Sequence, residues 1–370
     1  MDKNGYEMDI SNNMLQKLDF SSAVYQQISK QFGIIDSFKG KWKNIEGKER
    51  KYLKELRKIA TIESIGSSTR IEGASLTDQE IEKLLKSVKI TRLQTRDQQE
   101  VVGYYEALEL ILDNYSDIEL SERYIHQMHG ILLKHSNKDQ THKGKYKNLS
   151  NQVVANYPDG TQRIIFRTTE PHLVENEMRQ IISWTNEQFA KEDMHPLLII
   201  SAFIYEFLSI HPYQDGNGRL SRLLTSLILM QQGYDFIQYI SFENIIEKEK
   251  EKYYRALMDG QKNRYKKEER IDKWILFFLD CLITLTQRLE IKYATYNKLI
   301  TALNNRQKEI LQYFKPNKTV ALIEIESALK SYSRNTLKKD LAYLVAEGFI
   351  QKIGTTGRGV AYHLKNKKQK

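Results

Sequence analysis

The feature that most limits how this chain can fold is a nearly continuous apolar run at residues 196–210, which reads PLLIISAFIYEFLSI. A helix that is hydrophobic on almost every face has to lie inside its domain. His211 follows this run, and Pro212 prevents a simple continuation of the helix. Residues 219–233 then repeat apolar side chains at helical spacing. The sequence therefore predicts a buried helix, a short turn and a second, amphipathic helix.

The turn between the two helices carries groups that suit phosphate. Gly216 and Gly218 let an anion approach the backbone closely, and the free N–H groups and dipole at the start of the second helix attract negative charge. Arg219 and Arg222 are three residues apart, so they lie on neighbouring faces of its first turn and can reach two different anions. The pattern is not a Walker A loop, which needs Lys-Ser/Thr after its second glycine.

Two further side chains in the turn supply catalytic chemistry. Asp215 is a hard oxygen ligand that suits a magnesium ion bridging phosphates. His211, whose imidazole titrates near neutral pH, can accept a proton from a hydroxyl. Each residue taken alone is more typical of a cap, a turn or a solvated surface. It is their spacing that predicts a single site with a phosphate cradle, a metal and a base.

Composition places this site in a globular protein. The chain is 40% hydrophobic and 28% charged, and its single cysteine, Cys281, excludes an intrachain disulfide and favours a reducing compartment. The residues after Met1 lack the pattern of a signal peptide, and no apolar run is long enough to span a bilayer. We therefore expect a cytoplasmic protein with no membrane partner.

The full segment at 211–222, HPYQDGNGRLSR, resembles the signature of the Fic family, His-Pro-Phe-x-(Asp/Glu)-Gly-Asn-Gly-Arg-x-x-Arg. Tyr213 stands where phenylalanine is usual, which keeps an aromatic anchor. The helical pattern from about residue 100 to 235 agrees with the family's all-helical core. Fic proteins typically transfer AMP from ATP to a hydroxyl of a target protein. The resemblance thus implies an ATP-dependent adenylyltransferase that requires Mg²⁺.

The resemblance also implies a role for each residue of the signature. His211 is expected to be the general base that deprotonates the target hydroxyl, and Asp215 to be the magnesium ligand. The remaining signature residues are expected to bind the phosphates of ATP: Gly216, Asn217 and Gly218 as the loop, and Arg219 and Arg222 as the pair that holds the distal phosphates.

Two upstream segments fit the same family. Residues 151–170 contain Pro-Asp-Gly between two β-prone runs, which predicts a hairpin, and in the family this hairpin is a flap on which a target protein with a Ser, Thr or Tyr hydroxyl docks as an added strand. Ser68, Glu72 and Gly73 resemble the family's inhibitory motif, in which the glutamate pairs with the second signature arginine. Ser68 and Glu72 share a helix face, and Gly73 is a natural residue to end that helix.

The last 70 residues form a basic module. Residues 301–370 hold 14 Lys and Arg against 5 Asp and Glu, a net charge of +9, whereas the first 300 residues hold 43 against 42. This asymmetry indicates an anionic partner. Three helices are expected near 306–314, 321–330 and 333–346, followed by the β-prone runs FIQKI and AYHL around a glycine-rich turn. This order resembles a winged helix-turn-helix domain.

DNA is the expected partner of this module, with protein docking or dimerisation as the alternative use of the fold. The third helix presents polar residues suited to phosphates and base edges, and the wing carries one arginine at its tip. The candidate nucleic-acid contacts are Arg334, Asn335, Lys338, Lys339 and Arg358.

The sequence as a whole predicts a mainly α protein. Its expected parts are an N-terminal helical region with the inhibitory motif, 1–100, a Fic core with a β-hairpin flap and following helices, 101–300, and a winged helix-turn-helix domain, 301–370. The expected function is self-inhibited transfer of AMP to a target protein and to the chain itself. One alternative, from another class, is a DNA-binding regulator whose Fic core senses nucleotide. The other is an enzyme that uses the same site to remove AMP. A homodimer is a further expectation from the resemblance.

Overall fold

Helix α8 (Pro196–Ile210) lies in the core of the first part of the computed structural model, and every residue from Ile199 to Ile210 is buried. Helices α7 (Pro171–Lys191) and α9 (Asn217–Gln231) pack against α8, and α5 (Arg96–Asn114) packs against α9. The buried helix, turn and second helix predicted from the sequence are therefore confirmed. The structure describes residues 10–47, 49–87, 93–156, 162–301, 303–314, 319–354 and 360–364.

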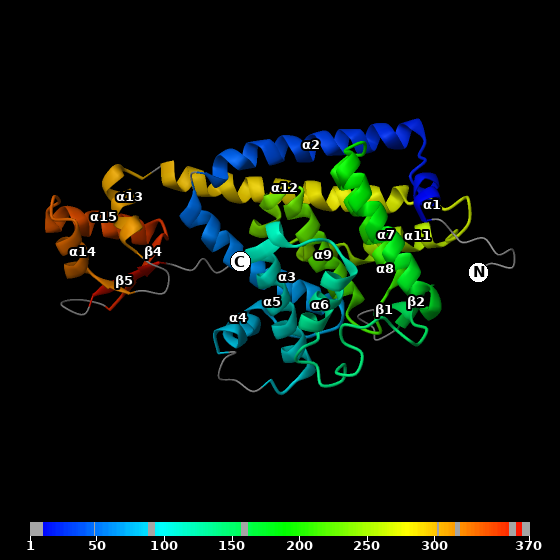
Figure 1. Cartoon of the computed structure of the whole chain (residues 1–370). Coiled ribbons are helices and arrows are strands. Elements are labelled where there is room, and N and C mark those ends of the chain that lie inside the picture. Colours follow the sequence, from blue (N-terminus) through cyan, green and yellow to red (C-terminus); the bar gives the residue numbers. More distant parts are fainter. Residues whose placement is uncertain are drawn as a thin grey trace. The chain divides into compact units, whose positions relative to one another are not determined.

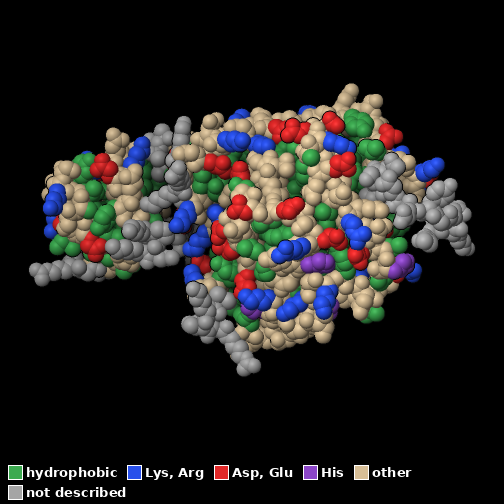
Figure 2. All heavy atoms as spheres, viewed as in Figure 1, with side chains coloured by type: hydrophobic (Ala, Val, Ile, Leu, Met, Phe, Trp, Pro, Cys, Tyr) green, Lys and Arg blue, Asp and Glu red, His purple; other side chains and the backbone are tan. Residues whose placement is uncertain are grey.

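Contacts divide the chain into two units, Met1–Leu289 and Glu290–Lys370. In the first unit, α3 (Arg50–Ile71) packs against α5 and α9, which brings its C-terminal end to the turn before α9. On the face drawn in Figure 2, basic and acidic side chains are interspersed over this unit. Its other helices are α1 (Ile10–Lys17), α2 (Ser22–Glu46), α4 (Asp78–Ser87), α6 (Glu122–Leu132), α10 (Phe242–Lys248), α11 (Lys250–Gln261) and α12 (Asp272–Thr301, which continues into the second unit), with the short 3₁₀ helices η1 (Tyr115–Asp117) and η2 (Asp235–Tyr239).

A β-hairpin interrupts the helices between α6 and α7 (Figure 1). Strands β1 (Gln152–Asn156) and β2 (Gln162–Arg167) are antiparallel, with a bulge between Val153 and Val154. This confirms the predicted hairpin. Its Pro-Asp-Gly turn lies outside the described residues.

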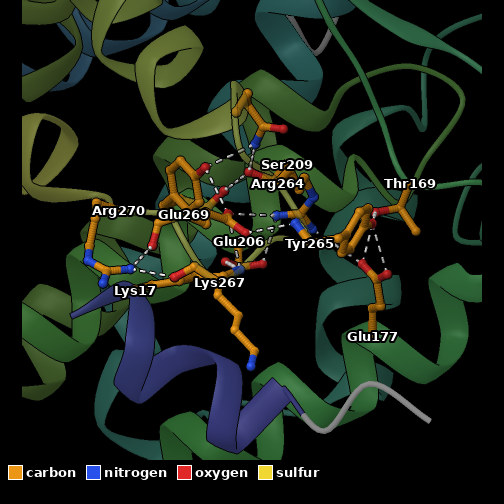
Figure 3. A network of polar contacts seen from close by, with 12 residues as sticks. Lys17, Thr169, Glu177, Glu206, Ser209, Arg264, Tyr265, Lys267, Glu269 and Arg270 are labelled. Atoms are coloured by element: carbon orange, nitrogen blue, oxygen red, sulfur yellow. Dashed lines mark hydrogen bonds and ion pairs between the residues drawn. The ribbon is translucent and has the colours of Figure 1, made fainter. Parts of the chain in front are cut away.

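A buried network of charged side chains holds α8 to its neighbours (Figure 3). Glu206 on α8 accepts from Lys17 Nζ at 2.5 Å and pairs with Arg264 Nη1 at 3.1 Å. Arg264 also lies 3.3 Å from Glu177 on α7, and Glu177 accepts from the Thr169 hydroxyl at 2.8 Å. Because Thr169 follows β2, the base of the hairpin is fixed to the same core as α8.

The second unit is built from helices α13 (Asn305–Tyr313), α14 (Leu322–Ala328) and α15 (Arg334–Ala346) and strands β3 (Val320–Ala321), β4 (Ile350–Ile353) and β5 (Ala361–Leu364). The strands pair antiparallel in the order β3-β5-β4. The three helices and the two longer strands lie where the sequence predicted three helices and two β-prone runs. The two-residue strand β3 was not predicted, since a strand this short has no readable alternation. Assignment of this unit as a winged helix remains a prediction.

Among the described residues, no helix is both long enough and apolar enough to cross a membrane.

Candidate active site

His211 ends α8 in a left-handed backbone conformation, with φ 53° and ψ 61°. Its ring Nδ1 lies 3.3 Å from the carbonyl oxygen of Leu208. Because a carbonyl can only accept, Nδ1 carries the proton and Nε2 carries the lone pair. Burial, together with the charge of Lys147, lowers the pKa of His211 to about 4. The ring is therefore neutral at pH 7, with Nε2 as its basic atom.

The turn after His211 is held by Asn217. Its Oδ1 accepts from the Tyr213 backbone N–H at 2.8 Å, and its Nδ2 donates to the Tyr213 carbonyl at 2.7 Å. Gly216, with φ 81°, then occupies the N-cap position of α9. The side chain of Asn217 is thus engaged in shaping the loop. The phosphate-binding role expected for Asn217 stays a prediction.

The buried rings of Tyr213 and His129 pack against each other beside this turn. The Tyr213 hydroxyl forms a hydrogen bond with His126 Nδ1 at 2.9 Å, and its ring stacks on His129 with centroids 3.7 Å apart. His129 Nδ1 accepts from the Gly144 N–H at 2.8 Å, so its Nε2 carries the proton that is donated to the Asp215 carbonyl at 3.0 Å. Burial lowers the pKa of His129 to about 4, which keeps this hydrogen-bonding pattern at neutral pH.

The sequence assigned no site role to His129. The available signal was its place on the buried stripe of α6, shared with Ile125, Met128 and Leu132. That periodicity indicates burial, whereas the partner of the ring comes from another part of the chain. Tyr213 is a related case, because its hydroxyl finds a partner that phenylalanine could not use.

Asp215 is surrounded by three cations. Its Oδ1 accepts from the Gly216 N–H at 2.6 Å and lies 3.2 Å from Arg219 Nη2, and its Oδ2 lies 3.3 Å from Arg96 Nη2 and 4.0 Å from Lys138 Nζ. Burial alone raises the pKa of this carboxyl, but the nearby cations outweigh it and hold the pKa below its usual value. Asp215 is therefore an ionised oxygen donor.

A single carboxylate fits magnesium only if other donors arrive with the substrate. Within the described residues, no group of three or more His, Cys, Asp or Glu side chains is arranged to hold a metal. Mg²⁺ is commonly bound by one or two carboxylates together with phosphate oxygens and water. The donor set at Asp215 suits that arrangement.

Arg219 is 1% exposed and lies between two acids. Its Nη1 is 3.2 Å from Glu100 Oε2, and its Nη2 is 3.2 Å from Asp215 Oδ1. Its buried Nε has no hydrogen-bond acceptor among the described residues. A buried guanidinium with a donor to spare suits a further anion.

Arg222 is bound by the end of α3. Its Nε donates to Ser68 Oγ at 2.7 Å, and its Nη2 donates to the Ser68 carbonyl at 2.9 Å and to Glu72 Oε1 at 2.8 Å. Although burial alone raises the pKa of Glu72, the guanidinium outweighs it and holds that pKa below its usual value. The ion pair expected from the family resemblance is therefore present. A Cβ at Gly218 would collide with Glu72 Oε1, so the carboxylate lies directly against the first turn of α9.

The position of Glu72 is fixed by the way α3 ends. Gly73, with φ 106°, and Ala74 close a Schellman motif: Gly73 N–H donates to the Arg70 carbonyl at 3.0 Å and Ala74 N–H to the Thr69 carbonyl at 3.1 Å. The predicted role of Gly73 as the helix-ending residue is confirmed. Arg70, in the last turn of α3, is held by two carboxylates. It donates to Glu247 Oε1 at 2.7 Å and to Asp78 Oδ1 at 2.9 Å.

The candidate nucleic-acid residues lie in the second unit. Asn335, Lys338 and Lys339 are exposed and share one face of α15. Arg334 is also exposed, and its Nε lies 3.1 Å from Glu326 Oε1. Arg358 lies outside the described residues.

Residues 119–229 match the Fic/DOC family model. Curated relatives named protein adenylyltransferase Fic are 25% identical over 231 residues in Drosophila willistoni and 27% identical over 234 residues in Aedes aegypti. Each match covers 62% of this chain and 41% and 42% of the relative, so the chain spans about two fifths of the length of these relatives.

Solved structures share the fold. A Fic family protein from Desulfovibrio desulfuricans G20 superimposes with a TM-score of 0.63 at 20% identity, covering 96% of this chain and 99% of that one. A Fic domain containing signaling protein from Bacteroides thetaiotaomicron gives a TM-score of 0.56 at 22% identity, covering 69% of this chain and 94% of that one. The mainly helical fold with its hairpin is thus a Fic fold. Residues 119–229 are therefore similar to the Fic/DOC family, and the chain shares the fold of the solved Fic structures.

Proposed function

We propose that this chain is a self-inhibited protein adenylyltransferase, which transfers AMP from ATP to a hydroxyl of a target protein. The observation that carries the proposal is the convergence of His211, Asp215, Arg219 and Arg222 on one turn at the start of α9. The curated relatives named protein adenylyltransferase Fic support the same reaction.

In this proposal the triphosphate of ATP lies against the start of α9. The backbone N–H groups there and the helix dipole attract the phosphates, and Arg219 Nε has a donor to spare for them. Asp215 would hold a magnesium ion together with the phosphates, and that ion would supply charge neutralisation for the departing pyrophosphate. Arg222 can bind the distal phosphate once Glu72 leaves it.

The chemical step uses His211 Nε2 as the base. The target hydroxyl gives its proton to Nε2 as its oxygen bonds to the α-phosphorus, and the bond from that phosphorus to the β-phosphate bridging oxygen breaks, releasing pyrophosphate. The His211 ring is neutral at pH 7, so its lone pair is free to accept the proton. A bound triphosphate raises the pKa of this ring, since negative charge favours the protonated form.

Glu72 is the inhibitory group of the proposal. Its carboxylate forms an ion pair with the guanidinium of Arg222 and fills the space beside Gly218. A γ-phosphate needs the same guanidinium and the same space at the start of α9. ATP therefore cannot adopt the productive pose while Glu72 is in place.

The target is proposed to dock on the β1–β2 hairpin. Two strands leave free edges for a third, and main-chain pairing places a hydroxyl with little demand on neighbouring side chains. Ile164 on β2 is 60% exposed, which offers an apolar contact for such a segment.

The test compares wild type, His211→Ala and Glu72→Gly in an assay with [α-³²P]ATP, magnesium and the protein itself or a lysate as acceptor. The proposal expects weak labelling by wild type, at least tenfold more by Glu72→Gly, and none by Glu72→Gly/His211→Ala. Glu63→Gln, a change on the same helix away from Arg222, serves as the matched control. Equal labelling with and without His211 would contradict the proposal, and release of AMP from a labelled protein would identify the reverse reaction.

A second candidate function is DNA binding by the second unit. It is supported by the exposed Asn335, Lys338 and Lys339 on one face of α15 and by the +9 charge of residues 301–370. A Lys338→Glu/Lys339→Glu variant is expected to weaken binding to a duplex at low salt at least tenfold while the transfer activity persists. Unchanged DNA affinity would contradict this function.

A further inference from the structure

Lys147 is a buried lysine next to the site that the family signature does not include. Only 4% of the residue is exposed, and its ammonium group makes three hydrogen bonds. Nζ donates to the Ile210 carbonyl at 3.1 Å, to Thr168 Oγ1 at 2.7 Å and to Asn151 Oδ1 at 2.8 Å. The three protons of the ammonium group are therefore all used.

The same residue also contacts the chain on the other side of His211. The Lys147 backbone N–H donates to the Pro212 carbonyl at 2.9 Å. Lys147 thus binds both carbonyl groups that flank His211, one through its side chain and one through its backbone. His211 has a positive φ, which costs free energy in a residue other than glycine and persists only where the surroundings enforce it. These two hydrogen bonds hold the carbonyl groups on both sides of that conformation.

The other two partners of Lys147 lie at the two ends of the hairpin. Asn151 immediately precedes β1, and Thr168 immediately follows β2. Asn151 Nδ2 in addition donates to the Tyr213 carbonyl at 2.9 Å. The next residue, Thr169, is anchored to Glu177 in the network of Figure 3. The base of the hairpin and the backbone around His211 therefore meet at one ammonium group.

We propose that Lys147 is a positioning residue, which couples the target-docking hairpin to the catalytic base and holds His211 in its left-handed conformation. This inference rests on the proposed function, because it gives the hairpin and His211 their roles. Lys147 contacts neither nucleotide nor target in the proposal. It acts through His211 and through the hairpin.

The charge of Lys147 has a second effect on the base. Burial lowers the pKa of Lys147 to about 8, although Glu170 and Glu177 favour its charged form while Arg264 opposes it. The group is therefore mostly cationic at pH 7. Around His211, Lys147 disfavours protonation of the ring, whereas Glu72 and Asp215 favour it. Removing the lysine charge is therefore expected to raise the pKa of His211.

The test measures His211 by NMR and transfer by kinetics in the Glu72→Gly background. Lys147→Met keeps the length of the side chain and removes its charge and donors, and Lys147→Arg keeps the charge. Lys145→Met, which changes an exposed lysine two residues earlier in the chain, is the matched control. Thermal unfolding of each variant establishes that it is folded. The His211 ring signals are followed from pH 4 to pH 9.

The proposal expects Lys147→Met to raise the His211 pKa by roughly one unit. It also expects a fall of at least tenfold in kcat at an unchanged KM for ATP, partial recovery in Lys147→Arg, and no change in Lys145→Met. Ring signals and a titration identical to those of the parent would overturn it. If the His211 pKa rises while no variant transfers AMP, the proposed function fails and the placement of His211 by Lys147 stands.

A second variant covers the case in which Lys147→Met does not fold. Thr168→Val removes the acceptor on the hairpin and leaves the lysine charge in place. The coupling predicts that amide hydrogen exchange becomes faster both in the hairpin and at the Lys147 N–H that binds Pro212. Faster exchange in the hairpin alone would overturn the coupling.

Discussion

The carboxylate of Glu72 lies 2.8 Å from the Arg222 guanidinium, although the two residues are 150 positions apart in the chain. The contact also fills the space in front of Gly218, where a Cβ would collide with Glu72 Oε1. An acidic side chain thus takes the position that the charge and geometry of the α9 N-terminus offer to a phosphate. In the proposed function, Glu72 and the distal phosphate therefore compete for the same region.

Because of the collision at Gly218, the effect of Gly218→Ala on stability is predicted to have opposite signs in wild type and in Glu72→Gly. Gly218→Ala is expected to destabilise the wild-type protein, because Glu72 or α9 has to move. In Glu72→Gly, the same change is expected to stabilise by about 0.5–1 kcal/mol, since alanine is the better helix former. Urea unfolding of the four proteins gives this cycle. Equal effects in both backgrounds would show that Glu72 does not lie over Gly218.

Arg70 is predicted to set the strength of inhibition without touching the site. Arg70 lies two residues before Glu72, and it binds the end of α3 to Glu247 and Asp78. Arg70→Met is expected to loosen this end and to raise transfer by about tenfold, the ratio that a shift of 1.4 kcal/mol gives. Arg57→Met, on the same helix and paired with Asp113, is the matched control and is expected to leave the rate unchanged. An Arg70 variant as slow as wild type would refute the role of this anchor.

The cations around Asp215 predict that divalent metal binds only together with nucleotide. Arg219, Arg96 and Lys138 oppose a lone dication beside this carboxylate, whereas a triphosphate brings both negative charge and oxygen ligands. In Glu72→Gly, Mn²⁺ used as an EPR probe is expected to bind with ATP and not without it. Asp215→Asn is expected to weaken the ATP-dependent binding at least tenfold. Tight Mn²⁺ binding without nucleotide would contradict this account.

The low pKa of His129 predicts that the free energy of unfolding falls in acid. Its pKa is lowered by burial from 6.5 to about 4, so the unfolded chain binds a proton that the folded chain refuses between these values. Stability therefore rises with pH across this window and falls as the pH drops below 6.5. The slope from one such group approaches about 1.4 kcal/mol per pH unit. His211, whose pKa is also about 4, contributes in the same window. His129→Gln is therefore expected to reduce the slope of the unfolding free energy with pH between 4.5 and 6 without abolishing it, and an unchanged slope would exclude a contribution from His129.

Much of this site was readable from the sequence because its central part is local. The apolar run, His211 and the glycines lie within one continuous segment, so their order along the chain already gives the helix, turn and helix. Glu72 could be connected to Arg222 only through the family resemblance, since no spacing rule joins residues 150 positions apart.

Residues whose partners come from elsewhere in the fold stayed hidden. The sequence shows that His129 lies on an apolar stripe, but not that the ring binds the Asp215 carbonyl. In the sequence, Lys147 is one of several lysines within residues 143–147. Only the structure shows that Lys147 is buried whereas Lys145 is exposed. The two hydrogen bonds of the Asn217 side chain to the Tyr213 backbone could likewise not be predicted from its place in the signature. Such roles depend on tertiary contacts and therefore required the structure.

The central claim is that the start of α9 holds the triphosphate beside His211, and the most direct measurement is a crystal structure of Glu72→Gly with a non-hydrolysable ATP analogue and magnesium. The account predicts phosphate oxygens on the backbone N–H groups of residues 216–218, the distal phosphate on Arg222, and His211 Nε2 facing the α-phosphate. A nucleotide bound elsewhere, or a His211 ring turned away from the phosphates, would contradict it.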